Sequence, residues 1–441
     1  MTNRSQVSAA PVQHGASAIP YGSGRFAAVA LAMAAALLVG GANGAINHLV
    51  VQLAAIPLFI SLLRNPSPPA LMGWFVLAAL AVATLQLVPL PPEVWVALPG
   101  RDQAAQVLDV AGLGAQWRPL ALDPGAAAMA LASLFAPIVL LFGVRTLDSD
   151  QRRRLLVGVA AFALASAALG VLQRIGGGLA LYDGAHTGFS VGLMINRNHH
   201  ADLIIAGVLL LPLALPAGAS RHLALALTVV IAGLAVSVMA TTSRAGMALA
   251  VPATLLSLAL LWRLRARWIL LAALVLALVV ALIARMPAYS GLVARFSHVA
   301  DDERMTIAAN TLVAIRHFWP WGTGYGSFVP VYAAFEDLDR MHANRVIAAH
   351  NDYLQIVLEG GFAGVITLAG ALAILAMLGW RLASRRAGLE GWAPFAVAIF
   401  LLVHSAFDFP LRMAALSCLM AMCIGCADAV QHEIAKKRNT T

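Results

Sequence analysis

Charge is scarce in this chain of 441 residues, because Asp, Glu, Lys and Arg make up 11% of it while hydrophobic residues make up 61%. Soluble domains carry roughly a quarter charged residues, so this composition excludes a soluble globular protein. The apolar residues lie in runs long enough to cross a bilayer, which takes about 20 residues per helix. The fold class that follows is an all-α, polytopic integral membrane protein.

Cysteine is almost absent as well. Cys418, Cys423 and Cys426 all lie in the last apolar run, and none lies in a loop. These positions provide no disulfide framework. Because their neighbours are Leu, Met and Ala, we interpret the three cysteines as packing residues and not as metal ligands.

About twelve apolar runs qualify as membrane spans. They cover roughly 26–43, 46–63, 70–90, 126–144, 155–173, 201–219, 222–240, 245–262, 268–285, 352–380, 391–409 and 411–430. An even number of spans places both termini on one side. Residues 1–25 do not resemble a cleavable signal peptide and are expected to be a polar tail. Residues 26–430 then form a single transmembrane domain, and 431–441 form a basic tail.

Basic residues decide the orientation of these spans. They cluster after spans four, eight and ten and in the C-terminal tail, on one side once the spans alternate. The residues are Arg145, Arg152, Arg153, Arg154, Arg263, Arg265, Arg267, Arg381, Arg385, Arg386, Lys436, Lys437 and Arg438. By the positive-inside rule that side is the cytoplasm, so the net charge of +9 reflects topology and not nucleic-acid binding. Two large loops, at about 91–125 and 286–351, are then expected outside.

Polar residues gather at the outer ends of the predicted helices. The candidate site residues are Asn198, Arg244, Arg304, His350, Asn351, His404, Asp408 and Arg412. Singly, an Arg at a helix end can snorkel to lipid headgroups, and a lone His at an interface is more often structural. Ionisable groups within a span, such as His404 and Asp408, are costly and tend to be functional. The recurrence of Arg, His and Asp on one face favours a functional site there.

These residue types indicate a particular chemistry. Guanidinium groups bind phosphate through a bidentate fork, and a neutral imidazole accepts a proton from an attacking hydroxyl. Together they predict group transfer from a lipid pyrophosphate, in which Arg stabilises the departing diphosphate and His activates the acceptor. His199 and His200 lack the spacing of a metal site, so we expect no metal and no cofactor.

Two glycine-rich segments accompany the candidate residues. Residues 321–326 (WGTGYG) follow a predicted helix capped by Asp301 or Asp302 and ending before Pro320. Because no strand precedes them, they fail the context of a dinucleotide site and are interpreted as a turn back to the membrane. Residues 359–364 (EGGFAG) allow close helix approach or a break. Unwinding there would leave His350 on a short external helix.

The motifs resemble those of the O-antigen ligase and polymerase superfamily. His350-Asn351 followed by Gly361-x-x-Gly364 is similar to the ligase signature, and residues 320–328 are similar to the glycine-rich segment upstream of it. Other similar segments are Asn196-Arg197-Asn198-His199, Ser243-Arg244-Ala245-Gly246, Arg304, and His404-Ser405 with Asp408-Phe409. The resemblance covers roughly residues 190 to 412.

This resemblance implies a GT-C-like, inverting, metal-independent glycosyltransferase of the bacterial inner membrane. The donor would be an undecaprenyl-diphosphate-linked glycan in the periplasm, and the acceptor would be lipid A core or a growing glycan. His350 would activate the acceptor, and Arg244 and Arg304 would hold the donor diphosphate. The other candidate residues would support these three. No cofactor is implied.

Several functions remain open at this point. Ligation of a polysaccharide to lipid A core is the first hypothesis, polymerisation of lipid-linked repeat units is the second, and protein O-glycosylation shares the same motifs. A secondary transporter would show matching half-repeats and ionisable residues near mid-bilayer. The sequence shows no detectable repeat between its halves and no charged pair at mid-span.

Overall fold

The computed structural model describes residues 21–440 apart from 43, 65–70, 177–178, 180, 183–187, 265–299, 338 and 340–344. Within these residues the chain is helical, with one pair of two-residue antiparallel strands, β1 (Pro89–Leu90) and β2 (Arg118–Pro119). The predicted span 268–285 and most of the predicted N-terminal tail lie outside the described residues. The predicted all-α class is confirmed for the part described.

Seven helical segments in the described ranges are long and apolar enough to cross a membrane. They are α2 (Ala45–Arg64), α6 and α7 together (Pro124–Ser133, Phe135–Val144), α8 (Ser149–Gly176), α10 (Arg221–Thr241), α11 (Arg244–Leu261), α16 (Asp352–Ser384) and α18 (Ala414–Thr440). Three shorter apolar helices accompany them, α1 (Tyr21–Val39), α3 (Leu71–Leu85) and α17 (Leu389–Ser405). The full number of twelve spans stays a prediction.

The predicted span 201–219 has a different structure. Helix α9 (Arg197–Leu210) ends early, and the 3-10 turn η1 (Leu211–Ala214) follows it. Pro212 explains this end, because proline has no amide hydrogen to continue the α-helical ladder. Every residue of α9 after Arg197 is buried. The prediction of one helix through 219 is therefore wrong, and α9 is an interior helix of the bundle.

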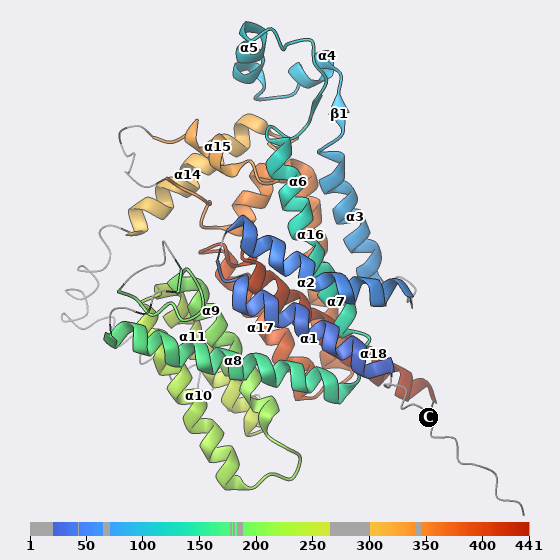
Figure 1. Cartoon of the computed structure of the whole chain (residues 1–441), viewed down its shortest axis with the longest axis vertical. Helices are drawn as coiled ribbons and strands as arrows, with labels where there is room; N and C mark the ends of the chain where they lie inside the picture. Colours follow the sequence, from blue (N-terminus) through green and yellow to red (C-terminus); the bar gives the residue numbers. More distant parts are fainter. Residues whose placement is uncertain are drawn as a thin grey trace, which may run out of the picture.

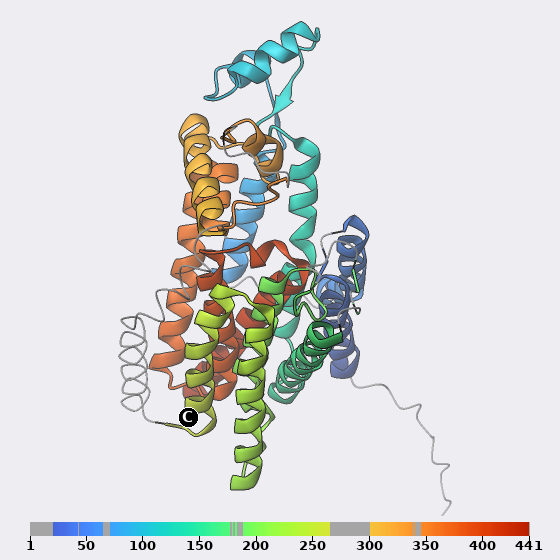
Figure 2. The same cartoon turned by 90° about the vertical axis from the view of Figure 1, so that its left-hand side faces the viewer.

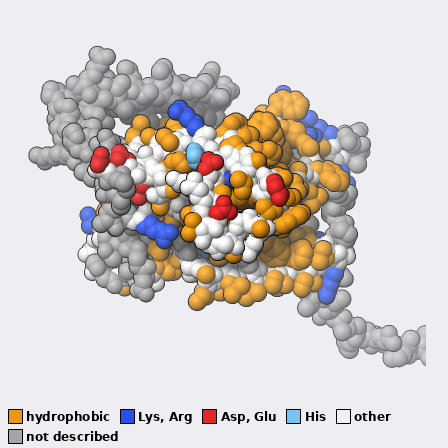
Figure 3. All heavy atoms as spheres, turned by 90° about the horizontal axis from the view of Figure 1, so that it is seen from above, with side chains coloured by type: hydrophobic (Ala, Val, Ile, Leu, Met, Phe, Trp, Pro, Cys, Tyr) orange, Lys and Arg blue, Asp and Glu red, His pale blue; other side chains and the backbone are white. Residues whose placement is uncertain are grey.

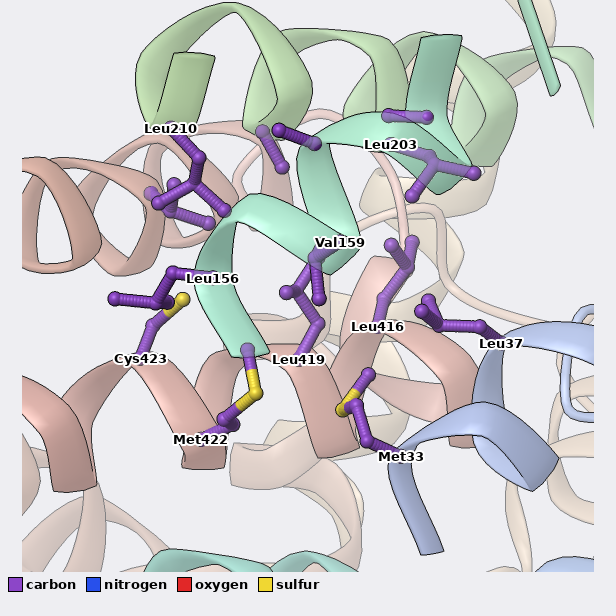
Figure 4. Packing of buried hydrophobic residues seen from close by; sticks show 14 of the residues in the cluster. Met33, Leu37, Leu156, Val159, Leu203, Leu210, Leu416, Leu419, Met422 and Cys423 are labelled. Atoms are coloured by element: carbon purple, nitrogen blue, oxygen red, sulfur yellow. The ribbon is translucent and has the colours of Figure 1, made fainter. Parts of the chain in front are cut away.

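The core of the bundle packs around α9 and α18. Figure 4 shows side chains of α1, α8, α9 and α18 meeting, among them Leu156, Leu203, Leu419 and Cys423. Their interdigitation fixes the position of α9, whose N-terminal residues contribute to the candidate site described below. All three cysteines are buried in α18 and unpaired, in agreement with their interpretation as packing residues.

Three of the four basic clusters meet at the C-terminal half of α18, which itself carries the basic tail. From the cluster after span four, Arg145 Nε lies 2.8 Å from Asp428 Oδ2 and Arg152 Nη2 lies 2.6 Å from Glu433 Oε1. From the cluster after span ten, Arg385 hydrogen-bonds to Gln431. Their connections therefore lie at one end of the bundle, as the predicted topology requires. Which side of the membrane this end faces stays a prediction.

The two predicted outer loops also lie together, at the other end of the molecule (Figures 1 and 2). The first contains β1, β2, α4 (Pro92–Val96) and α5 (Asp102–Val110), and the second contains α14 (Ala300–Phe318) and α15 (Phe328–Ala333). Arg101 joins the two loops, because its buried guanidinium donates to Leu120 O and Gly322 O and lies over the rings of Trp95 and Phe318. Helix α14 begins at Ala300, so the prediction that Asp301 or Asp302 precedes it as a cap is wrong.

Helix α16 breaks at Gly361, whose φ of 55° and ψ of −141° are not helical. Of the two alternatives that the sequence left open at residues 359–364, close helix approach or a break, the structure shows a break. The glycine-rich segment satisfies the backbone groups at the break: Thr323 N donates to Leu358 O, Gly324 N donates to Glu359 O, and Phe362 N donates to Pro320 O. A Cβ at Gly361 would lie 2.2 Å from Pro320 O, so glycine is required for this close approach.

His350 does not lie on an external helix. It stands two residues before α16, outside the helix, and Asn351 is the N-cap of α16. The break is instead used to pack the glycine-rich segment against α16. The prediction of a short external helix bearing His350 is therefore wrong.

Candidate functional site

The imidazole of His350 lies beside the carboxylate of Asp408. His350 Nδ1 is 3.1 Å from Asp408 Oδ1, and Asp408 follows the end of α17 at Ser405. The side chain of His350 is 27% exposed and that of Asp408 is fully buried, so a substrate could reach only the imidazole. His350 also has φ = 49°, a left-handed conformation that is rare for a residue with a side chain and that recurs at active sites.

Asp408 is held by two further groups. Asn198 Nδ2 donates to Asp408 Oδ2 at 2.5 Å, and Arg304 Nη2 lies 3.8 Å from the same oxygen. Arg304 also donates from Nη1 to Phe407 O. Burial acts to raise the pKa of Asp408, but the hydrogen bond from His350 and the charge of Arg304 outweigh burial and hold this pKa well below its ordinary value. Asp408 is therefore ionised.

An ionised carboxylate fixes the tautomer of His350. Because it can only accept hydrogen bonds, the proton of the neutral imidazole must lie on Nδ1. Nε2 then carries the lone pair and is the atom able to accept a proton. The arrangement resembles other His–carboxylate pairs in which the carboxylate orients the ring and stabilises the imidazolium that forms.

Phe409 holds the ring of His350 from another direction. Its ring packs edge to face against His350 and also against His199, with centroids 5.1 Å apart in both pairs. His199 is buried in α9, so this contact also anchors the site to the interior helix.

Three guanidinium groups meet next to this pair. Arg197 is the first residue of α9, Arg244 is the first residue of α11, and Arg304 lies in α14. Burial lowers the pKa of Arg197, and the positive charges of Arg304 and Arg244 lower it further, while Asp408 acts in the opposite direction. These groups are thus close enough to act on one another. Figure 3 looks onto the end of the molecule that carries the outer loops, where acidic, basic and histidine side chains lie among hydrophobic ones.

Spacing explains why α9 and the end of α17 meet here. Asn198 and Asp202 are four residues apart on one face of α9, while His404 lies in the last turn of α17 and Asp408 lies just beyond its end. Asn198 binds Asp408, and Asp202 Oδ1 lies 2.5 Å from His404 Nδ1. His404 is fully buried, so its contact is with Asp202 and it does not line the exposed site.

Asn351 and Arg412 lie next to the site but contact other partners. Asn351 accepts from Leu354 N as the cap of α16 and donates from Nδ2 to Ala406 O, which joins α16 to the end of α17. Arg412 Nη2 lies 3.1 Å from Glu359 Oε2, and its Nε lies 3.5 Å from Asp352 Oδ1. Arg412 therefore neutralises two buried carboxylates of α16, and its ion pairs within the described residues do not include His350 or Asp408.

One protein-family model matches part of the chain. Residues 227–369 match the model of the family described as O-antigen ligase. The match covers about a third of the chain, so this segment is similar to the O-antigen ligase family. It contains Arg244, Arg304, His350 and Asn351, whereas Asn198 and Asp408 lie outside it and reach His350 through the fold. No curated protein matches the chain. The long apolar helices together with this similarity indicate a multi-pass membrane protein.

The structure adds residues to this candidate site that the sequence did not indicate. Arg197 joins the guanidinium cluster, Asp202 pairs with His404, and Asp352 and Glu359 pair with Arg412. Arg197 lies in the Asn196–His199 motif, from which the sequence indicated only Asn198 as a candidate site residue. The signal for Asp202 was its spacing of four residues from Asn198.

A cavity of about 370 Å³ opens between the two outer loops, away from the His350 pair. Gly100, His317, Phe318, Val331 and Phe335 are among its lining residues, and none of the predicted site residues lines it. Within the described ranges, no group of three His, Cys, Asp or Glu side chains could hold a metal ion.

Proposed function

We propose that this protein transfers a glycan from an undecaprenyl-diphosphate carrier to lipid A core on the periplasmic face of the inner membrane. The observation that carries the proposal is the pairing of an accessible imidazole with a buried, ionised carboxylate beside a cluster of guanidinium groups. The O-antigen ligase family supports the same class of reaction. Polymerisation of lipid-linked repeat units is the second candidate, because the same site chemistry serves either acceptor.

The acceptor side of the reaction depends on His350. An acceptor hydroxyl attacks the anomeric carbon of the donor sugar, and its proton passes to His350 Nε2. Asp408 keeps the other ring nitrogen protonated and stabilises the positive charge that forms on the ring. Attack from the face opposite the diphosphate inverts the anomeric configuration.

The donor side depends on the guanidinium groups. The bond between the anomeric carbon and the diphosphate oxygen breaks, and the electron pair leaves with the diphosphate. Arg244 and Arg304 bind the diphosphate and stabilise the charge that develops on it. Arg304 is oriented for this by its bond to Phe407 O and by Asp408. No step needs a metal ion or a nucleotide.

Deleting the gene from the bacterium that carries it separates the two candidate functions. Loss of a ligase should leave long glycan chains on undecaprenyl diphosphate and unsubstituted lipid A core. Loss of a polymerase should leave single repeat units on the carrier. Mass spectrometry of the extracted glycolipids distinguishes these results, and an unchanged profile of both lipids would contradict both functions.

A further inference from the structure

We infer that Arg197 is a third ligand of the anionic diphosphate, acting together with Arg244 and Arg304. This inference rests on the proposed function and extends the donor site beyond the two arginines that the sequence indicated. It assigns to Arg197 the stabilisation of the diphosphate as it departs, and it leaves the acceptor side of the reaction to His350.

A hydrogen bond of Arg197 connects it to the turn that carries Arg244. Arg197 Nη1 donates to Thr242 Oγ1 at 2.7 Å. Thr242 ends α10, and Ser243 then caps α11, which begins at Arg244. A side-chain bond therefore connects Arg197 to the short turn that carries Arg244.

The other side of Arg197 leads to Arg304. Asn198, the next residue in the chain, donates to Asp408 Oδ2, and Arg304 Nη2 lies 3.8 Å from that same oxygen. Arg197 is thus connected to Arg304 indirectly, through its neighbour Asn198 and the carboxylate of Asp408 that Asn198 and Arg304 share. The three arginines come from α9, α11 and α14, so tertiary packing and not local sequence brings them together.

The environment of Arg197 also favours binding of an anion. Its guanidinium lies over the ring of Phe189, 4.4 Å from the centroid, which restricts its orientation. It is held at the N-terminus of the buried helix α9, which adds positive potential. The positive charges of Arg304 and Arg244 repel it, and the carboxylate of Asp408 attracts it. An anion bound between the arginines would relieve this repulsion.

A diphosphate fits this arrangement better than a monophosphate. Two phosphoryl groups present oxygens over a longer span and carry more negative charge, which three guanidinium groups from three helices can share. When the sugar leaves, the terminal phosphate gains a further negative charge. A third arginine should therefore stabilise the transition state more than the bound donor, so its loss should lower kcat more than it raises KM.

The test compares Arg197→Gln with Arg221→Gln, both purified in lipid nanodiscs. Arg221 is an exposed arginine at the first position of α10, at the opposite end of that helix from Thr242. The probes are undecaprenyl diphosphate and undecaprenyl phosphate, with binding measured directly. We expect Arg197→Gln to weaken diphosphate binding by about 10- to 100-fold, the loss usual for a hydrogen bond between charged groups. Monophosphate binding should fall less, and Arg197→Lys should be intermediate.

The outcomes separate this inference from the proposed function. Unchanged diphosphate affinity in Arg197→Gln would overturn the role of Arg197 alone. Equal weakening in Arg197→Gln and Arg221→Gln would show a general effect of surface charge and would overturn it too. If the wild type bound no undecaprenyl diphosphate, the proposed function would fail and this inference with it. If Arg197→Gln does not fold, Arg197→Lys gives the same comparison with the charge kept.

Discussion

Replacing His350 by Ala should lower glycan transfer by about 100- to 10,000-fold, the usual contribution of a general base. The variant loses Nε2, the only atom of the His–Asp pair that the acceptor can reach, because Asp408 is fully buried. Transfer is measured with purified protein, a lipid-linked glycan and lipid A core. Binding of undecaprenyl diphosphate should stay close to wild type, since the arginines remain.

Two controls make the result specific to His350. His222→Ala removes an exposed histidine near the start of α10 and should leave transfer unchanged. Membrane levels of both variants should match those of the wild type. Full transfer by His350→Ala at normal membrane levels would remove His350 from the reaction.

Asp408→Asn should reduce transfer almost as much, by about 100- to 10,000-fold. The substitution keeps the size of the side chain but replaces an acceptor oxygen by an amide group that can donate to His350 Nδ1. The imidazole proton would then move to Nε2, so the ring could no longer accept a proton from the hydroxyl. The imidazolium would also lose its stabilising charge.

The pH dependence of transfer distinguishes this role of Asp408 from a structural one. Because its pKa is held well below the ordinary value, Asp408 stays ionised across the working range, and wild-type activity should not follow its titration. Asp408→Asn should lower transfer at every pH, because the amide can hold the proton of the neutral ring on Nε2 and transfer is then limited by this wrong tautomer. The rate of transfer by Asp408→Asn should therefore stay on a low plateau and should not recover at high pH. Full recovery there would contradict the tautomer role, and Asp150→Asn, an exposed change at the start of α8, is the control.

Local motifs identified several of the candidate site residues before the structure brought them together. His350, Arg244 and Arg304 lie in recognisable segments, and the break at Gly361 followed from two adjacent glycines in an apolar run. Ionisable residues near helix ends, such as Asp408, were also identifiable, because their cost in an apolar setting calls for a function. The structure then supplied their contacts.

Other features depended on tertiary packing and could not be predicted. Hydropathy does not distinguish a helix buried among helices from one facing lipid, so α9 was predicted as an ordinary span although it is shorter and enclosed. Residues 321–326 form hydrogen bonds with the backbone groups that the break of α16 leaves without helical partners, and these groups lie more than thirty residues away along the chain. Arg197 was missed because only the fold brings it beside Arg244 and Arg304.

The central claim is that His350 and its arginines face the periplasm, and accessibility in spheroplasts tests it most directly. The three native cysteines are buried in α18, so cysteines introduced at His350 and Ser384 can be labelled against a low background. Ser384 is exposed and lies beside the basic cluster at the other end of α16. A membrane-impermeant maleimide should label His350→Cys in intact spheroplasts and Ser384→Cys only after permeabilisation. Labelling of Ser384→Cys in intact spheroplasts, with His350→Cys protected until lysis, would contradict the account.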